Sequence, residues 1–455
     1  MLDVGRHPNI SLLAYSEVEK VQGQAGDFQV QIRKKARYVD EARCTGCGAC
    51  TEKCPTVVPD AFNEGLGQRK AIYSWFAQGI PSTHTIDTDH CRVFAGKKCG
   101  ACAKACQAEA IDFDQQDQLL DLEVGAIIVA IGYDVFDPSR IPEYRYKDLD
   151  NVVTAMEFER LLSASGPTGG HLDRPSDRAV MDRIVELEKT VKKSRRAVDN
   201  FEKKFERSSE DFYAGYQPGD PDQDQESQKW AKAYEKWLKE KNELEELQEK
   251  AKGFSVAKNL AFIQCVGSRD IRFYPFCSGY CCMHSIKEAI IAHEHEPETE
   301  STIFGMDIRA VGKGFEEYKV RGGNTSNITY KRTRVAEIVK GSNNNPVVVY
   351  EDTQSRQIKR EPFDLVILAT ACAPSRANPA LAETLGIEIN EFGFFRTDDA
   401  NPMDTSKPGI FVCGCSHSPM DIPESVAQAS SAATRAVQVI TSRFGPQAKG
   451  LRKAS

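Results

Sequence analysis

The feature that most constrains this chain is a run of four cysteines near its N-terminus. The run has the pattern C-x2-C-x2-C-x3-C-P, and its cysteines are Cys44, Cys47, Cys50 and Cys54. Soft thiolate ligands suit iron, and the two-residue spacers let one tight turn direct three sulfurs inward. The small residues Gly46, Gly48 and Ala49 leave room for a bulky group. The spacing therefore predicts a [4Fe–4S] cluster, and a fourth cysteine before proline typically serves a second cluster.

A second cysteine set lies downstream and supplies the partner that the first run requires. It consists of Cys91, Cys99, Cys102 and Cys106. Its first spacer is longer than that of the first run, and Gln107 replaces the usual proline. We predict cross-ligation, in which one cluster is held by Cys44, Cys47, Cys50 and Cys106 and the other by Cys91, Cys99, Cys102 and Cys54. A pair of zinc sites is the alternative, but zinc ribbons use two separated C-x2-C knuckles.

A third group of cysteines lies far from the first two sets. It consists of Cys265, Cys277, Cys281 and Cys282. The apolar residues 260–263 predict a strand, so Cys265 follows a strand end, where sites in α/β sheets usually lie. Cys281 and Cys282 are expected to open a helix, whose free N–H groups favour a negatively charged cluster. The spacing indicates a third cluster, and buried structural cysteines or a redox-active dithiol are the alternatives.

Composition limits the class of protein. With 455 residues, 40% of them hydrophobic, the chain can form two or three domains. Fifteen cysteines without an export signal indicate reduced thiols and a cytoplasmic location. The longest apolar runs are too short to span a bilayer, so we expect no direct membrane insertion. A net charge of −7 argues against nucleic-acid binding, which needs a cationic face.

Two apolar segments and a C-terminal turn resemble those of flavoproteins with two dinucleotide-binding domains. Residues 123–133 and 363–372 are expected to be buried parallel strands that end in small residues. Residues 409–415 predict another strand and turn, and Pro423 suits the first turn of a following helix. Four small apolar residues along that helix are expected to face a sheet: Val426, Ala429, Ala433 and Val437. A core helix without a flavin would show the same periodicity, so the pattern alone leaves both interpretations open.

Taken together, the motifs resemble the HdrA-like family of heterodisulfide reductase subunits. The matching segments are residues 3–9, the two ferredoxin-like cysteine sets, and residues 166–170, 264–270, 281–282, 312–317 and 414–427. The resemblance implies an α/β fold with a thioredoxin-reductase-like flavoprotein body, an inserted 2[4Fe–4S] ferredoxin domain and a helical hairpin insertion. It also implies that the third cysteine set holds a cluster. It places FAD against Gly132, Cys372, Gly414, Cys415, Asp421 and Ile422.

The sequence departs from this family in its FAD fingerprint. No strand is followed by G-x-G-x-x-G, and the nearest string, in residues 312–317, lacks the third glycine. The resemblance places the family's fingerprint upstream of Met1, so the flavoprotein body is expected to be truncated at its N-terminus. We expect a separate chain to supply that FAD-binding segment. The family's C-terminal ferredoxin extension is not found after residue 443 either.

A second departure is the insertion at residues 178–253, which is rich in Lys, Glu and Gln. One helix is predicted from Ile184, Leu187, Val191, Val198, Phe201 and Phe205, and another from Trp230, Tyr234, Trp237, Leu244 and Leu247. A turn at residues 217–224 would join them into an antiparallel hairpin. The hairpin has more aromatic residues than two helices need for packing, which favours a docking role over that of a solvated spacer.

The expected domain organisation has six segments. They are a partial FAD-domain segment (1–36), the ferredoxin-like insertion (37–115), an FAD-domain continuation (116–177), the helical hairpin (178–253), a second α/β domain with the third cluster (254–362) and the C-terminal part of the FAD domain (363–455).

The function implied by these features is electron distribution within a large oxidoreductase complex, through FAD and three [4Fe–4S] clusters. In related complexes such a flavin can bifurcate electrons between acceptors of low and high potential. The resemblance implies partners like HdrB and HdrC, MvhD or NADH-dehydrogenase-like modules, or a class II benzoyl-CoA reductase complex. We find no catalytic residues for substrate chemistry in this chain. The alternative is a flavin-less, cluster-bearing scaffold that positions and connects its partners.

Overall fold

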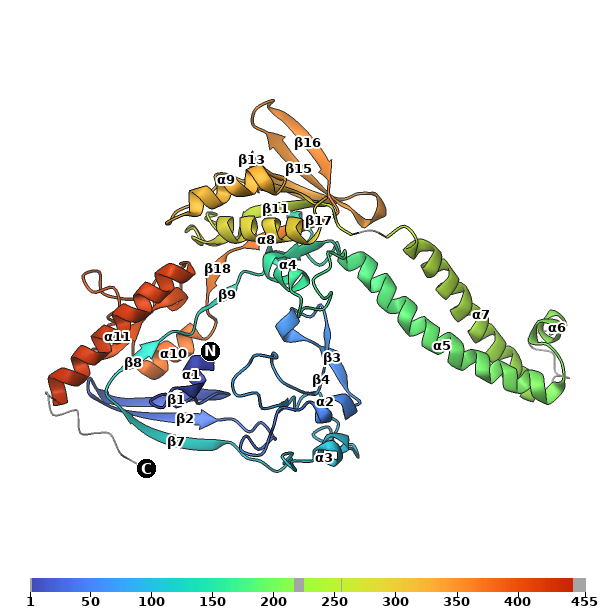
Figure 1. Ribbon diagram of the computed structural model, residues 1–455, viewed down its shortest axis with the longest axis horizontal. Coiled ribbons are helices and arrows are strands. Elements are labelled where there is room, and N and C mark those ends of the chain that lie inside the picture. Colours follow the sequence, from blue (N-terminus) through green and yellow to red (C-terminus); the bar gives the residue numbers. More distant parts are fainter. Residues whose placement is uncertain (1, 217–224, 255, 445–455) are drawn as a thin grey trace.

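The computed structural model describes residues 2–216, 225–254 and 256–444, and the predicted α/β class is confirmed (Figure 1). In this view a parallel sheet forms the upper part of the molecule, and an antiparallel sheet with the cysteine-rich segment forms the lower part. A long helical arm projects to one side. Within the described ranges, no helix combines the length and the apolar character needed to cross a bilayer.

The centre of the upper part is a five-stranded parallel sheet. Its strands, in spatial order, are β10 (Val152–Thr154), β17 (Leu365–Thr370), β11 (Asn259–Val266), β12 (Glu300–Gly305) and β13 (Ile328–Arg332). The helices on one face are α4 (Ala155–Leu162), α8 (Cys281–His295) and α9 (Phe315–Thr325). The other face is covered by the antiparallel strands β14 (Val335–Lys340), β15 (Pro346–Asp352) and β16 (Gln357–Pro362).

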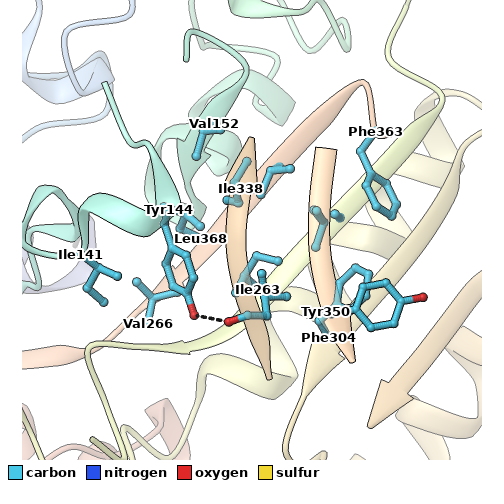
Figure 2. Close-up of a cluster of buried hydrophobic side chains, with 14 of the residues drawn as sticks. Ile141, Tyr144, Val152, Ile263, Val266, Phe304, Ile338, Tyr350, Phe363 and Leu368 are labelled. Atoms are coloured by element: carbon cyan, nitrogen blue, oxygen red, sulfur yellow. Dashed lines mark hydrogen bonds between the residues drawn. The ribbon is translucent and has the colours of Figure 1, made fainter. Parts of the chain in front are cut away.

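Successive residues of β11 enter different cores, because neighbouring side chains in a strand point to opposite faces. Leu260 and Phe262 pack with the helices, whereas Ala261 and Ile263 pack with the antiparallel strands. Figure 2 shows the second of these cores, where the Tyr144 hydroxyl donates to the Val335 carbonyl at 3.2 Å. Burial on both faces explains why residues 260–263 form a continuous apolar run.

The lower part contains a three-stranded antiparallel sheet of β1 (Ser16–Gln24), β2 (Asp27–Lys34) and β7 (Gln118–Val124). Lys34 pairs with Gln118, so the ends of the intervening segment, 35–117, lie side by side. This segment packs around its own core, which contains six of its cysteines. Its elements are α2 (Ala49–Lys53), β3 (Val57–Pro59), η1 (Ala61–Asn63), β4 (Gln68–Lys70), β5 (Ile72–Tyr73), β6 (Thr85–Ile86) and α3 (Ala101–Ala105).

Two strand pairs connect the upper and lower parts. β8 (Ile127–Val129) runs parallel to β19 (Ile410–Val412), and β9 (Tyr133–Val135) runs antiparallel to β18 (Cys372–Pro374). The other elements are α1 (Leu2–Arg6), η2 (Pro138–Arg140), η3 (Pro142–Tyr144), η4 (Ser342–Asn344), α10 (Asn378–Leu385), η5 (Gly414–Ser416) and α11 (Ile422–Phe444).

The expectation of one buried strand over residues 123–133 is wrong. The chain leaves β7 at Val124 and enters β8 at Ile127, with Gly125 between them. β8 pairs with β19 alone in the described part of the chain, and Ile128 is 41% exposed. The other predicted strand is confirmed in β17, all six residues of which are buried.

The predicted packing face of α11 is also wrong. Val426 and Val437 are each 60% exposed, and Ala429 and Ala433 are exposed as well. The helix packs instead through Ala432, Ala436 and Val439, which contact Phe411 of β19 and Cys413 after it. Both stripes have helical spacing, so periodicity could not identify the buried one.

The predicted helical hairpin is confirmed. It consists of α5 (Pro175–Phe205) and α7 (Gln225–Ala251), which pack along each other with the short helix α6 (Ser209–Ala214) at the far end (Figure 1). The predicted turn at 217–224 lies outside the described residues. The aromatic surplus is used inside the arm, because Phe212 of α6 stacks on Trp230 of α7 at 4.0 Å.

Candidate metal centres and cofactor cavity

The first cysteine run forms a loop that leads into α2. Cys47 is exposed and Cys50 is buried, so the run reaches from the surface into the core. Gly48, just before α2, has a φ of +80°, and a Cβ there would meet no atom within 4 Å. This open space fits a group held inside the loop. Burial raises the pKa of the Cys50 thiol, and negative charge on Cys44 raises it further.

The second cysteine set lines a small cavity. The cavity is bordered by four thiols, those of Cys54, Cys91, Cys99 and Cys102, and by apolar side chains that include Ile72 and Ile86. Burial raises the pKa of Cys102 to about 11, and charges on Cys91 and Cys54 act in the same direction. Cys54 of the first run therefore lies with the second set, which is the arrangement that cross-ligation requires.

Cys106 is not among the residues that line this cavity. It packs in the common core that holds Cys44 and Cys50 together with cysteines of the second set, and α3, which precedes it, contacts α2. Its sulfur accepts a hydrogen bond from the backbone N–H of Ala110 at 3.4 Å. Such an N–H bond stabilises a thiolate and would tune a cluster bound to it. Ligation by all eight cysteines stays a prediction.

The third set gathers where β11 ends and α8 begins. Cys265 has a φ of +60°, at a point where the pairing of β11 with β17 shifts register. This uncommon backbone conformation interrupts the pairing, which resumes when Val266 pairs with Thr370, so Cys265 lies within the last residues of β11 rather than after its end. Cys281 is the first residue of α8, and Cys282 is buried beside it. The predictions of a strand before Cys265 and a helix from Cys281 are both confirmed.

The thiols of the third set are close enough to influence each other's charge. Burial is the main cause that raises the pKa of the Cys281 thiol to about 12. Negative charges on Cys265, Cys282 and Cys277 raise this pKa further. Arg269 opposes this effect at Cys265, which it contacts, while its guanidinium also pairs with Asp307 at 2.5 Å. Burial and the neighbouring thiols thus favour the neutral forms of these cysteines, whereas Arg269 and the N-terminus of α8 act in favour of negative charge at this position.

The described residues contain no group of three His, Cys, Asp or Glu side chains arranged around a single metal ion. A cubane separates its ligand sulfurs more widely than one ion does, because each sulfur binds a different iron atom.

A mainly apolar cavity lies between α4, α8 and the start of α11. Its volume is about 520 Å³, within the range of small-molecule and cofactor sites. Apolar lining comes from Met156, Met283 and Met420. The rings of Tyr133 and Tyr280 border one side with centroids 5.8 Å apart. An aromatic group suits this apolar and aromatic lining.

Three of the six residues predicted to contact FAD line this cavity: Cys415, Asp421 and Ile422. Cys372 is fully buried behind Cys415, and the two thiols are in hydrogen-bond contact. Gly132, with a φ of +76° and open space at its Cβ position, donates its N–H to the Ser416 hydroxyl at 3.0 Å. Gly414 donates its N–H to Gln428 at 3.0 Å. Three of the six residues thus line the cavity, and the other three lie in the segments next to it. Contact of all six with FAD stays a prediction.

One acidic group in this cavity was not predicted from the sequence. Glu288 is 4% exposed, lines the cavity, and has one carboxylate oxygen without a hydrogen-bond partner among the described residues. Burial raises its pKa, and His284, one helical turn earlier at 3.4 Å, partly opposes the shift. The sequence feature that could have indicated Glu288 is its position on the helix face of Ile286, Ala289 and Ile290, which is otherwise apolar.

Known proteins are similar in sequence to this chain over most of its length. Residues 37–60 match the model of the 4Fe-4S binding domain family. An A-type iron–sulfur subunit of CoB–CoM heterodisulfide reductase from Methanopyrus kandleri is 41% identical over 444 residues, covering 97% of this chain and 55% of that protein. The A-type subunit of ferredoxin:CoB-CoM heterodisulfide reductase from Methanosarcina acetivorans is 37% identical over 445 residues, covering 97% and 49%. The chain spans about half the length of the relatives it matches.

Solved structures of thioredoxin reductases are also similar in part. The Lactococcus lactis enzyme covers 41% of this chain at 21% identity, with a TM-score of 0.29. The T. acidophilum enzyme covers 41% at 17% identity, with a TM-score of 0.28.

The fold and the family match define the class as iron–sulfur proteins in which a 4Fe-4S binding domain is inserted in an α/β body. The relatives make the assignment more specific. The chain belongs to the HdrA-like family of heterodisulfide reductase subunits.

Proposed function

We propose that this chain transfers electrons within a multi-subunit oxidoreductase and holds three [4Fe–4S] clusters and an FAD. The observation that carries the proposal is the grouping of twelve of the fifteen cysteines into three sets of four, each combining buried thiols with thiols nearer the surface. Exposed Cys47 and Cys99 bring two of the sets close to solvent, where a partner's redox centre can approach.

The residues of the chain have distinct parts in this function. The cysteines hold iron, and at the third site Arg269 and the N-terminus of α8 balance the charge of the thiolates. FAD, when bound, exchanges electrons in pairs or singly, whereas each cluster carries one electron at a time. The methionines exclude water from the cavity, and Glu288 with His284 can hold a proton at its wall.

Part of the FAD site would come from outside these 455 residues. The sequence offers no G-x-G-x-x-G loop for the pyrophosphate, and the parallel pair β8–β19 lacks further strands within the described residues. Parallel sheets are normally covered on both faces. The exposed apolar stripe of α11, with Ile422 80% exposed, is a surface that the completing segment would cover.

The partners would be subunits that carry out the substrate chemistry. Relatives are named as subunits of heterodisulfide reductases, and one from Methanothermobacter marburgensis as part of a hydrogen-dependent heterodisulfide and ferredoxin reductase. We propose subunits of the same kinds for this chain, with electron bifurcation at the FAD as the way electrons are divided. A cytoplasmic location fits the fifteen free thiols.

Metal and sulfide analysis of anaerobically purified protein tests the proposal. Three clusters require about 12 iron and 12 sulfide atoms per chain, together with a paramagnetic resonance signal after reduction. Zinc without sulfide would replace the proposal with two or more structural zinc sites. Cys282→Ala should lower iron by about four atoms per chain, because only the third site loses a ligand. Cys413→Ala, at a buried cysteine that packs against α11, should leave the iron content unchanged.

The absent pyrophosphate loop specifically favours the flavin-less scaffold as a second candidate. Flavin released from the intact complex and counted per copy of this chain separates the two functions. One FAD per chain supports electron distribution through a flavin. A full set of clusters with no flavin in any subunit that contacts this chain supports the scaffold.

A further inference from the structure

Three cysteines lie outside the three candidate cluster sites, and two of them form a pair. Cys372 begins β18, and Cys415 lies in η5, 43 residues later in the chain. Their thiols are in hydrogen-bond contact, although they come from separate segments that meet only in the folded chain. Cys372 is fully buried, whereas Cys415 lines the apolar cavity. The third cysteine, Cys413, packs in a core and has no cysteine neighbour among the described residues.

The backbone holds both members of the pair in place. The N–H of Cys372 donates to the Ser278 hydroxyl at 3.0 Å, and the preceding Ala371 carbonyl accepts from Phe136 at 3.0 Å. On the other side, the N–H of Gly414 is bonded to Gln428, and the Cys415 thiol donates to the Met420 carbonyl at 3.5 Å. Disulfides require closely placed sulfurs on a backbone that does not have to move far. Both cysteines stand on anchored segments, β18 and η5, that contact each other.

The two thiols also differ in the way that thiol–disulfide chemistry needs. Contact with Cys372 lowers the pKa of Cys415 to about 6, while contact with Cys415 and burial raise the pKa of Cys372. These opposite shifts favour the proton on the buried sulfur of Cys372, and they make the sulfur of Cys415 at the cavity wall the easier of the two to deprotonate. The thiolate is the reactive form of cysteine.

We propose that Cys372 and Cys415 form a reversible dithiol–disulfide couple at the wall of the cavity. Oxidation breaks two S–H bonds and forms one S–S bond, and it releases two electrons and two protons. A two-electron acceptor takes them, either an isoalloxazine ring in the cavity or a small disulfide that enters it. The identification of a flavin as the internal acceptor rests on the proposed function, but the couple itself does not.

This couple would place a group that accepts or donates two electrons at the cavity wall, close to the proposed one-electron cluster of the third cysteine set. Cys372 is near enough to Cys281 of the third cysteine set for the charge of Cys281 to act on it. The redox state of the pair would also change the cavity wall, because a disulfide has no thiolate charge.

Disulfide mapping of the anaerobically purified, cluster-loaded protein tests the proposal. The protein is treated with oxidised glutathione, free thiols are alkylated, and the peptides are analysed by mass spectrometry. We expect a linked pair of peptides containing Cys372 and Cys415, lighter by two hydrogens, that disappears after treatment with a phosphine reductant. Its yield should follow the ratio of oxidised to reduced glutathione. Alkylation of both residues at every ratio would overturn the proposal, as would a link from either of them to Cys281.

Variants give an internal control for this experiment. Cys415→Ser and Cys372→Ser should each lower the yield of the linked peptide at least tenfold. Cys413→Ser lies two residues from Cys415 and lacks a cysteine neighbour among the described residues, so it should leave the link intact. Iron and sulfide are measured on the same samples. Normal cluster content without the link refutes the couple alone, whereas a link in protein without iron refutes the proposed function alone.

Discussion

Cys54 is the residue that best distinguishes cross-ligation from two independent cluster motifs. It belongs to the first run in sequence but lines the cavity of the second set in space. If Cys54 and Cys99 hold the same cluster, substitution of either cysteine removes the iron of that cluster. Substitution of the second cysteine then removes no further iron. The ligand assignment therefore predicts which double variants lose more iron than the single variants and which do not.

The first prediction concerns paired alanine substitutions. Cys54→Ala combined with Cys99→Ala should lose about four iron atoms per chain, no more than either single variant. Cys54→Ala combined with Cys47→Ala should lose about eight, because two clusters are affected. Iron and acid-labile sulfide per chain measure both outcomes. The reverse pattern would assign Cys54 to the first cluster.

The second prediction concerns the buried carboxyl of Glu288. Burial raises its folded pKa above the unfolded value of about 4.3, so the native state holds the proton more tightly than the unfolded state does. The contribution of this proton to the free energy of unfolding is fully present below the pKa of Glu288 in the unfolded state. It is lost as the pH rises through the pKa of Glu288 in the folded state. Glu288→Gln has no proton to lose and should escape this loss.

The expected result is a higher melting temperature for Glu288→Gln than for the unaltered protein at pH 8, with the difference shrinking toward pH 5. Anaerobic thermal unfolding at several pH values measures it. Glu298→Gln is the matched control, because Glu298 is exposed and paired with Lys258 at the surface. A difference for Glu288→Gln that grows as pH falls would show that its carboxyl is ionised in the folded state.

At the scale of elements, the arm has its own small aromatic core. Trp230 is 2% exposed, stacks on Phe205 and Phe212, and donates its indole N–H to the Ser209 hydroxyl at 2.7 Å. This one side chain joins α5, α6 and α7. Removing it leaves a large cavity and an unpaired hydroxyl, far from the cysteine sites.

We therefore predict that Trp230→Ala destabilises the far end of the arm by about 3–5 kcal/mol, the usual cost of deleting a buried Trp side chain. Proteases should cleave within α6 and the adjoining helix ends much faster than before, while iron content stays the same. Lys236→Ala, an exposed site on the same helix with 71% of its side chain accessible, is the control and should change cleavage little. Equal cleavage of the two variants would mean that the aromatic stack adds little stability.

Elements with a strong local signal were predictable from sequence, and those that depend on distant partners were not. β11 and α8 are marked by an apolar run and by a helical repeat after Cys281, and both are confirmed. The exposed stripe of α11 and the break between β7 and β8 depend on which surface the rest of the chain covers. The periodicity of a single segment does not indicate which of its faces the rest of the chain will cover. The contact between Cys372 and Cys415 was beyond prediction for the same reason, because it is set by the pairing of β18 and the position of η5.

At the scale of the whole molecule, the helical arm is an addition to a closed body. The backbone N–H of Ala257, after the arm, donates to the carbonyl of Leu172, before it, at 2.8 Å. The two ends of the insertion therefore meet. Arg174 fixes the base through Asp177 and Asn345 at 2.6 and 2.7 Å, and none of the twelve candidate ligands lies on α5, α6 or α7.

Replacement of residues 178–253 by a short Gly/Ser linker should leave the body folded and its clusters loaded, since loop length has only a small effect on closure entropy. Most aromatic residues of the arm stack on one another, so a docking function would lie on its polar outer faces and on exposed side chains such as Met181, Val185 and Phe205, which are 46%, 47% and 38% exposed. We predict that the shortened chain retains its iron and sulfide but recovers less of its partner subunits on affinity purification. Recovery equal to that of the unaltered chain would make the arm a spacer. Loss of iron would show instead that the arm supports the body. The variants Met181→Ala and Val185→Ala, at exposed positions of α5, would then separate folding from docking, because neither side chain is buried.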